Sequence, residues 1–143
     1  MSFRKILVAV DRGPIAARAE DVGVELANSL KADLALIHVT EPPAAGSDMG
    51  ISIVEFMKVA RGEGQRLLTG IRERLSLPAA VHEFLEAGDA AAEIVKAAKE
   101  WPADLIVVGS AGRSGVSRVM LGSVAETIAR TAPCPVLIVR TRT

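Results

Sequence analysis

The chain has 143 residues, half of them hydrophobic, with a mean hydropathy of +0.33. This length favours one domain with a well-buried core, which we take to span residues 1–143. The 17 basic residues balance the 17 acidic ones, and aromatic residues make up only 3% of the chain, so we expect neither nucleic acid nor an anionic membrane as a partner.

The first elements in the chain are a strand and a helix. Residues 3–10 form a short, mostly apolar run that predicts a buried strand and is too short for the apolar part of a signal peptide. No apolar run approaches the ~20 residues that cross a bilayer, and a single cysteine excludes an intrachain disulfide, so we expect a cytoplasmic protein. Pro14 suits a first helical turn, and the apolar spacing predicts a helix at about 15–30.

The middle of the chain predicts two strands around a long helix. Residues 34–39 form a buried strand, followed by a loop at 40–50 rich in Pro, Ala, Gly and Ser. A helix is predicted from Ile53 to Leu75, in which Gly62 and Gly64 each cost about 1 kcal/mol relative to Ala, so we expect a kink there. The charges within residues 80–86 predict an edge strand.

The last third repeats the alternation. Gly88-Asp89 predicts the start of a helix that Pro102 ends, and residues 104–108 predict a fourth strand. Ser123 and Glu126 fit a capping box, in which their side chains accept N–H groups at the start of a helix running to about residue 131. Residues 135–140 predict a fifth strand. Five strands alternating with four helices predict an α/β fold with an open parallel sheet, helices on both faces and right-handed crossovers.

Few residues suggest catalysis. His38 lies in a buried strand and His82 in the edge strand, and we interpret both as structural because their spacing is not that of metal ligands. Cys134 is interpreted as a small buried residue at a strand start. No serine has an evident His–Asp partner. We therefore predict no catalytic residue and no metal held by the protein alone.

The segment GSAGRSG, residues 109–115, directly follows the fourth strand. Ligands of open α/β sheets bind beyond the carboxyl ends of the strands, where Asp11 also lies. Glycines let backbone N–H groups approach an anion, and a helix starting at Gly122-Ser123 offers further N–H groups. The spacing matches neither a Walker A loop nor GxGxxG. From the residues alone, the segment is either a phosphate cradle or a plain turn.

The spacing Gly109-x2-Gly112-x9-Gly122-Ser123 resembles the glycine motif of the ATP-binding universal stress proteins. KILVAVD near the start, and the sequence from ADLIVVGSAGRSG to PCPVLIVR, are similar to that family as well. The resemblance covers nearly the whole chain. It implies a Rossmann-like five-stranded parallel sheet in the order 3-2-1-4-5, related to the adenine nucleotide α-hydrolases, with the first and fourth strands adjacent.

The resemblance also implies a nucleotide site. Asp11 would bind the ribose hydroxyls, while Val10 and Val39 would pack beside the adenine. The ribose and phosphate contacts would come from Val108, Gly109, Gly112, Arg113, Gly122, Ser123 and Val124. The ligand would be ATP, with Mg²⁺ carried by its phosphates. The alternative interpretation of Val39 and Val108 is ordinary core.

One stretch departs from the family pattern. Many relatives follow the first Asp with Gly-Ser, whereas this chain has Asp11-Arg12-Gly13-Pro14. Pro14 has no N–H to donate. Arg12 either helps to neutralise phosphate or crowds the pocket.

We therefore expect a nucleotide-binding regulatory protein of the stress response. The resemblance implies a homodimer through the last strand, from Val136 to Arg140. One alternative is a dimeric interaction protein with a vestigial crevice. Another is slow ATP hydrolysis or autophosphorylation, with Ser110, Ser114 or Ser117 as acceptor. A third is an enzyme of the related nucleotide α-hydrolase type, which would use adenylate chemistry and for which no second substrate pocket is evident.

Overall fold

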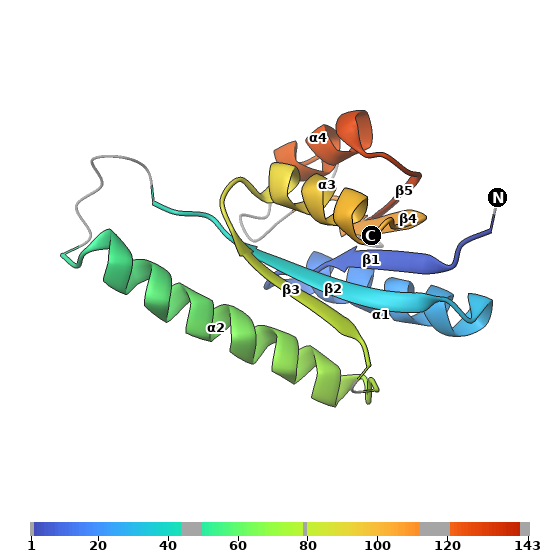
Figure 1. Cartoon of the computed structure of the whole chain (residues 1–143), viewed down its shortest axis with the longest axis horizontal. Helices are drawn as coiled ribbons and strands as arrows, with labels where there is room; N and C mark the ends of the chain where they lie inside the picture. Colours follow the sequence, from blue (N-terminus) through green and yellow to red (C-terminus); the bar gives the residue numbers. More distant parts are fainter. Residues whose placement is uncertain (1, 44–49, 79, 112–120, 141–143) are drawn as a thin grey trace.

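The computed structural model describes residues 2–43, 50–78, 80–111 and 121–140. Strands and helices alternate along the chain (Figure 1). The strands are β1 (Lys5–Ala9), β2 (Asp33–Thr40), β3 (His82–Ala87), β4 (Leu105–Gly109) and β5 (Val136–Val139). The helices are α1 (Pro14–Leu30), α2 (Ile53–Arg74), α3 (Ala90–Glu100) and α4 (Ser123–Thr131).

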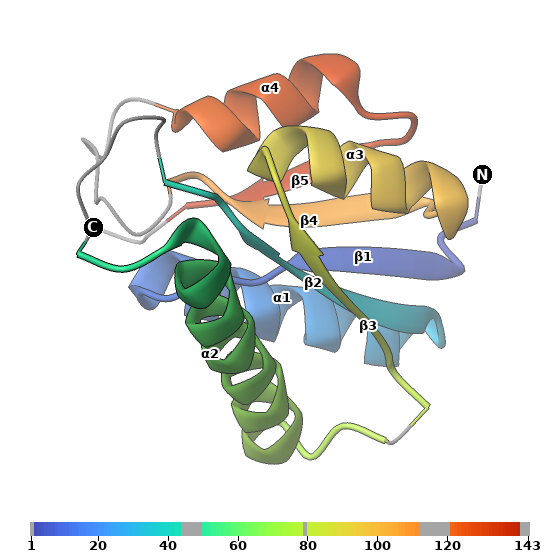
Figure 2. The same ribbon diagram turned by 60° about the vertical axis from the view of Figure 1, so that its left-hand side comes forward.

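The five strands form one parallel sheet in the order β3-β2-β1-β4-β5, which confirms the predicted fold. Helices α1 and α2 cover one face, and α3 and α4 cover the other (Figure 2). From β1, the chain adds β2 and β3 on one side of the sheet and then crosses to add β4 and β5 on the other side. The direction of the strand order therefore reverses between β1 and β4. Ligands of open α/β sheets bind at such a reversal, beyond the carboxyl ends of the strands.

The core consists of two apolar layers, one on each face of the sheet. In β1, Ile6 and Val8 pack toward α1 and α2, whereas Leu7 packs toward α3 and α4. All three side chains are fully buried. The alternation follows from the two-residue period of a strand, and both faces are apolar because helices cover both. Strand β3 lies at the sheet edge, as its charges predicted.

Helix α2 does not contain the expected kink. It continues unbroken from Ile53 to Arg74, through Gly62 and Gly64 (Figure 1). A Cβ at Gly64 would lie 2.7 Å from Leu85 Cδ1 and 2.8 Å from His38 Cδ2. The missing side chain therefore lets the helix approach β2 and β3 closely, a reason for glycine that local propensity does not reveal.

The predicted capping box at the start of α4 is also wrong. Gly122, not Ser123, is the N-cap, and no side chain of the described residues caps the helix. The Gly122 N–H donates to Ser110 O at 2.7 Å, which joins the helix start to the end of β4. Glu126 instead pairs with Arg130 at 3.0 Å, one helical turn later.

Two other expectations have mixed outcomes. Asp89 caps α3 as predicted, because its Oδ2 accepts the Ala92 N–H at 3.0 Å. Cys134 lies two residues before β5 and is half-buried rather than fully buried. Its side chain packs against the layer under α3 and α4, and burial raises the pKa of its thiol.

Among the described helices, none is long and apolar enough to span a membrane.

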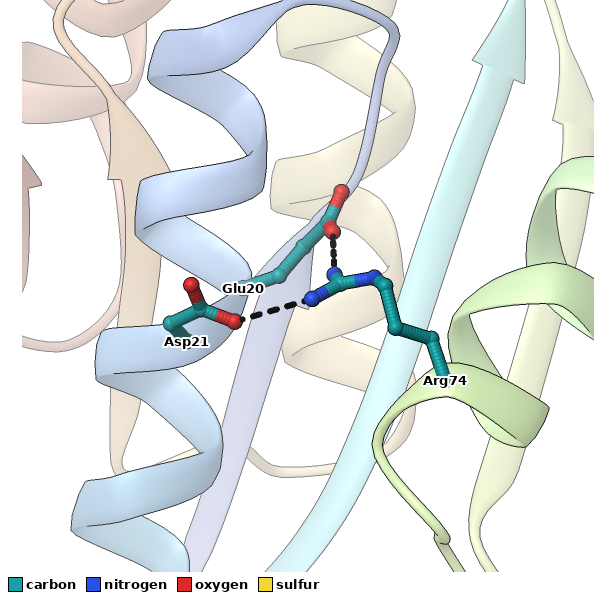
Figure 3. A network of polar contacts seen from close by, with 3 residues as sticks. All are labelled: Glu20, Asp21 and Arg74. Carbon is teal, nitrogen blue, oxygen red and sulfur yellow. Dashed lines mark hydrogen bonds and ion pairs between the residues drawn. The ribbon is translucent and has the colours of Figure 1, made fainter.

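Ion pairs connect α1 to α2 on their shared face of the sheet. Arg74, at the end of α2, lies between Glu20 and Asp21 of α1 (Figure 3). Its Nη2 is 2.8 Å from Glu20 Oε2, and its Nη1 is 3.2 Å from Asp21 Oδ1. Near the middle of α2, Glu63 pairs with Arg12 of the turn between β1 and α1.

Candidate functional site

A cavity of about 700 Å³ opens at the carboxyl edge of the sheet. The ends of β1, β2 and β4 form its floor, and the starts of α3 and α4 and the stretch of α2 from Phe56 to Leu67 contribute its walls. The volume lies within the ~300–1,000 Å³ range typical of small-molecule sites. The site therefore occupies the position that the sheet topology favours.

Eight of the ten residues expected at a nucleotide site line this one cavity. They are Val10, Asp11, Val39, Val108, Gly109, Gly122, Ser123 and Val124. The other two, Gly112 and Arg113, lie outside the described residues, as do Ser114 and Ser117. Segments more than a hundred residues apart in sequence thus meet because β1 and β4 are neighbours.

Hydrogen bonds fix the part of the cavity built by β1 and β2. The Val10 N–H donates to Ile37 O at 2.8 Å, and the Val10 carbonyl lies 3.1 Å from His38 Nδ1. A carbonyl oxygen can only accept a hydrogen bond, so the Nδ1 atom of His38 is protonated and donates to it. His38 therefore supports the end of β1, in agreement with its predicted structural role.

Asp11 lies two residues after the end of β1 and is half-buried. Its Oδ1 accepts the backbone N–H of Arg12 at 2.8 Å, which orients the carboxylate. A carboxylate has about four acceptor positions, so one such bond leaves capacity for further donors. The arrangement suits recognition of hydroxyl groups.

The start of α4 lies across the cavity from the β1–β2 side of the sheet. Gly122, Ser123 and Val124 belong to the N-cap and the first turn, where helical N–H groups have no partner within the helix. A Cβ at Gly122 would lie 3.1 Å from Ser110 O and 3.2 Å from Ala111 Cα. Backbone cannot move aside as a side chain can, so glycine permits this approach. An uncapped helix start attracts anions.

Gly109 has a packing role at the end of β4. A Cβ there would lie 2.9 Å from Ile15 Cγ2. The next residue, Ser110, is buried and donates its N–H to Val139 O at 2.8 Å. The first glycine of the motif thus lets the start of α1 approach β4 closely.

Sequence reasoning did not place α2 at the site. Five of its side chains, together with Gly64, line the cavity: Phe56, Val59, Ala60, Glu63 and Leu67. Their spacing of three to four residues is that of one helical face. The apolar pattern alone did not distinguish a face that lines a cavity from a face that lies in the core.

The structure shows what Arg12 does. Its Nη2 lies 3.0 Å from Glu63 Oε2, with side-chain exposures of 50% and 44%. Pro14 occupies the first turn of α1, where a missing N–H removes no helical hydrogen bond. The cavity remains open with both residues in place.

Outside the cavity, His82 is exposed on β3, with its ring centroid 5.8 Å from that of Trp101. No group of three or more His, Cys, Asp or Glu side chains suited to a metal ion occurs within the described ranges.

The model of the Universal stress protein family matches residues 2–140. The chain belongs to this family. It is 36% identical to Universal stress protein YxiE of Bacillus subtilis, covering 96% of this chain and 99% of that protein. It is 32% identical to Universal stress protein MJ0531 of Methanocaldococcus jannaschii, covering 96% and 82%.

Solved structures of the family share the fold. Universal stress protein UspA from Lactobacillus plantarum superposes with a TM-score of 0.86 at 24% identity, covering 98% of this chain and 99% of that one. A universal stress protein in complex with cAMP has a TM-score of 0.74 at 25% identity, covering 99% and 100%. The motif-based resemblance is therefore confirmed at the level of family and fold.

Proposed function

We propose that this universal stress protein binds an adenine nucleotide, ATP, in the cavity at the carboxyl edge of its sheet. The main support is the convergence of three features on that cavity: the Asp11 carboxylate, apolar strand ends and the uncapped start of α4. A nucleotide needs the same three surroundings, for its ribose, its base and its phosphates. The family member in complex with cAMP is a precedent for an adenine nucleotide as ligand.

The residues present fit the parts of this ligand. Val10 and Val39 offer apolar surface for the adenine, and Asp11 accepts hydrogen bonds from the ribose hydroxyls. The backbone N–H groups at Ser123 and Val124 would hold phosphate oxygens, and Gly122 lets this helix start lie close to Ser110 and Ala111. Mg²⁺ would arrive with the phosphates and neutralise part of their charge.

The proposed activity is regulatory binding rather than turnover. Efficient phosphoryl transfer requires positioned cations and a base that orients the nucleophile. His38 lines the cavity, and its Nδ1 lies within hydrogen-bond distance of the Val10 carbonyl, which fits the structural role assigned to it above. We propose that nucleotide occupancy of the cavity is the signal that partners of the protein read under stress.

The test is to identify what the purified protein carries. We expect denaturation of the wild type to release ATP or ADP, detected by mass spectrometry. Gly122→Ala should release little, because its Cβ would press on the backbone at Ser110 and Ala111. Gly70→Ala is the matched control, since a Cβ at Gly70 meets nothing within 4 Å.

A second variant separates loss of binding from loss of folding. Asp11→Asn keeps the size of the side chain, and we expect its affinity for ATP to fall about tenfold or more. Circular dichroism would verify that each variant is folded. An empty wild type that also fails to bind added ATP and Mg²⁺ would refute the proposal.

The alternative is an interaction protein that pairs through β5. This strand forms the sheet edge opposite β3, and its apolar residues Val136, Leu137 and Ile138 are only half-buried. Apolar edge strands invite pairing with another chain. We propose a homodimer through Val136 to Arg140, compatible with nucleotide binding in each copy.

A further inference from the structure

The pair formed by Arg12 and Glu63 lies in the wall of the proposed nucleotide cavity. Arg12 belongs to the turn after β1, and Glu63 belongs to α2, the wall that the sequence did not reveal. Both side chains remain in contact with water, at 50% and 44% exposure. An exposed pair of this kind shifts an equilibrium by no more than about fivefold, so a competing anion can replace it.

The charges around the cavity make this pair important for an anionic ligand. Among the described lining residues, Arg12 is the one Arg or Lys, and the carboxylates are Asp11, Glu41 and Glu63. Asp11 accepts a hydrogen bond from the Arg12 backbone, and Glu41 accepts one from the Ala90 N–H at 3.3 Å. Of these three carboxylates, Glu63 is paired with a cation, the guanidinium of Arg12. The Glu63 carboxylate therefore neutralises the Arg12 guanidinium, to which the phosphates of a ligand would bind.

The backbone places Arg12 near the glycine motif. Ile15, three residues later, lies against Gly109, where an added Cβ would be 2.9 Å from its Cγ2. Gly13 has a φ of +110°, which only glycine adopts readily, and Pro14 restricts the turn that follows. The turn that carries Arg12 is thus anchored to the end of β4 through Ile15, and Arg12 itself lines the cavity together with Gly109.

We propose that Arg12 contacts the phosphates of the bound nucleotide and pairs with Glu63 when the cavity is empty. Glu63 competes with the phosphates for Arg12 and thereby sets how strongly the site prefers phosphorylated ligands. This inference rests on the proposed function. Phosphate binding exchanges one charge-assisted hydrogen bond of the guanidinium for another and releases Glu63 to water. The ligand class selected is a nucleotide over its nucleoside.

The test compares the dissociation constants of ATP and adenosine by calorimetry. We expect Glu63→Gln to raise the preference for ATP over adenosine about two- to fivefold, because Arg12 becomes free. Arg12→Gln should lower this preference about fivefold or more, with adenosine binding unchanged. In the double variant, the gain from Glu63→Gln should disappear.

Glu100→Gln is the matched control. Glu100 pairs with Lys96 on the exposed side of α3, at 4.0 Å, so its substitution removes the same charge away from the cavity. We expect the preference for ATP to stay at the wild-type value in this variant.

Three outcomes would overturn the inference and leave the proposed function standing. One is an unchanged preference in both single variants. Another is an equal change for ATP and adenosine, which would make the pair a support of α2. The third is a gain from Glu63→Gln that persists without Arg12, which would indicate simple charge repulsion. A wild type that binds neither ligand would instead refute the proposed function itself, and the inference with it.

Discussion

Glu20 is a buried carboxyl group that faces a cation from another helix. Its side chain is 3% exposed, and Arg74 Nη2 lies 2.8 Å away (Figure 3). Burial raises the pKa of Glu20 to about 7, and the opposing effect of Arg74 does not cancel it. The nearby carboxylates of Asp21 and Asp11 raise it further.

This shift predicts a pH-dependent stability. The folded protein holds the Glu20 proton more tightly than the unfolded chain, whose carboxyl pKa is near 4.5. The resulting stabilisation is complete below about pH 4.5 and is lost as the pH rises through about 7. Relative to Glu20→Gln, the wild type should therefore lose unfolding free energy on the order of 1–3 kcal/mol across this window.

Urea denaturation of both proteins at several pH values would measure this loss. Glu100→Gln is the control, because Glu100 lies on α3, on the other face of the sheet, and pairs with Lys96 rather than with Arg74. We expect the difference between that variant and the wild type to vary little with pH. A constant difference between wild type and Glu20→Gln would contradict the assignment.

At the scale of elements, α2 shows how a helix is shaped by the surface that it packs on. The sequence predicted its position from the spacing of its apolar residues, and this was confirmed. The two glycines indicated a kink, because glycine weakens an isolated helix. The structure instead places Gly64 against His38 and Leu85, so its role comes from β2 and β3. Such a contact between distant segments is invisible to local patterns.

Alanine substitutions within α2 test this explanation. Gly64→Ala should lower the unfolding free energy by about 1–3 kcal/mol, because the added Cβ overlaps Leu85 and His38. Gly70→Ala should raise it by about 0.5–1 kcal/mol, because that position is open and alanine favours helix. Thermal or urea denaturation of both variants measures the contrast. A stabilising Gly64→Ala would show that α2 does not rest on the sheet at that point.

At the scale of the whole molecule, the alternation of strands and helices was predictable because each element has its own apolar period. The strand order came from the family resemblance, and the sheet confirms it. Hydrogen bonds and ion pairs between distant segments were not predictable. Gly122 is the N-cap of α4 and donates its N–H to Ser110, and Arg12 pairs with Glu63 in the wall of the cavity. Neither partner is a neighbour in sequence.

The open edge at β5 predicts a concentration-dependent dimer. The carbonyls of Pro135 and Val139 face β4, so the alternation of a strand turns the Val136 N–H outward. Val136→Pro would remove this donor without removing a bond to β4. Sedimentation equilibrium should show a dimer for the wild type and a larger monomer fraction for the variant. A monomeric wild type at all concentrations would contradict pairing through this edge.

Nucleotide binding in the cavity is tested most directly by a calorimetric titration of ligand-free wild-type protein with ATP in the presence of Mg²⁺. We predict saturable binding of one nucleotide per chain, with a dissociation constant below the millimolar range. The binding free energy should therefore be more favourable than about −4 kcal/mol. Asp11→Asn should bind more weakly in the same titration. A flat titration of folded wild-type protein up to millimolar ATP would contradict the account. The glycine motif would then be a plain turn, and the function would have to be sought at the β5 surface.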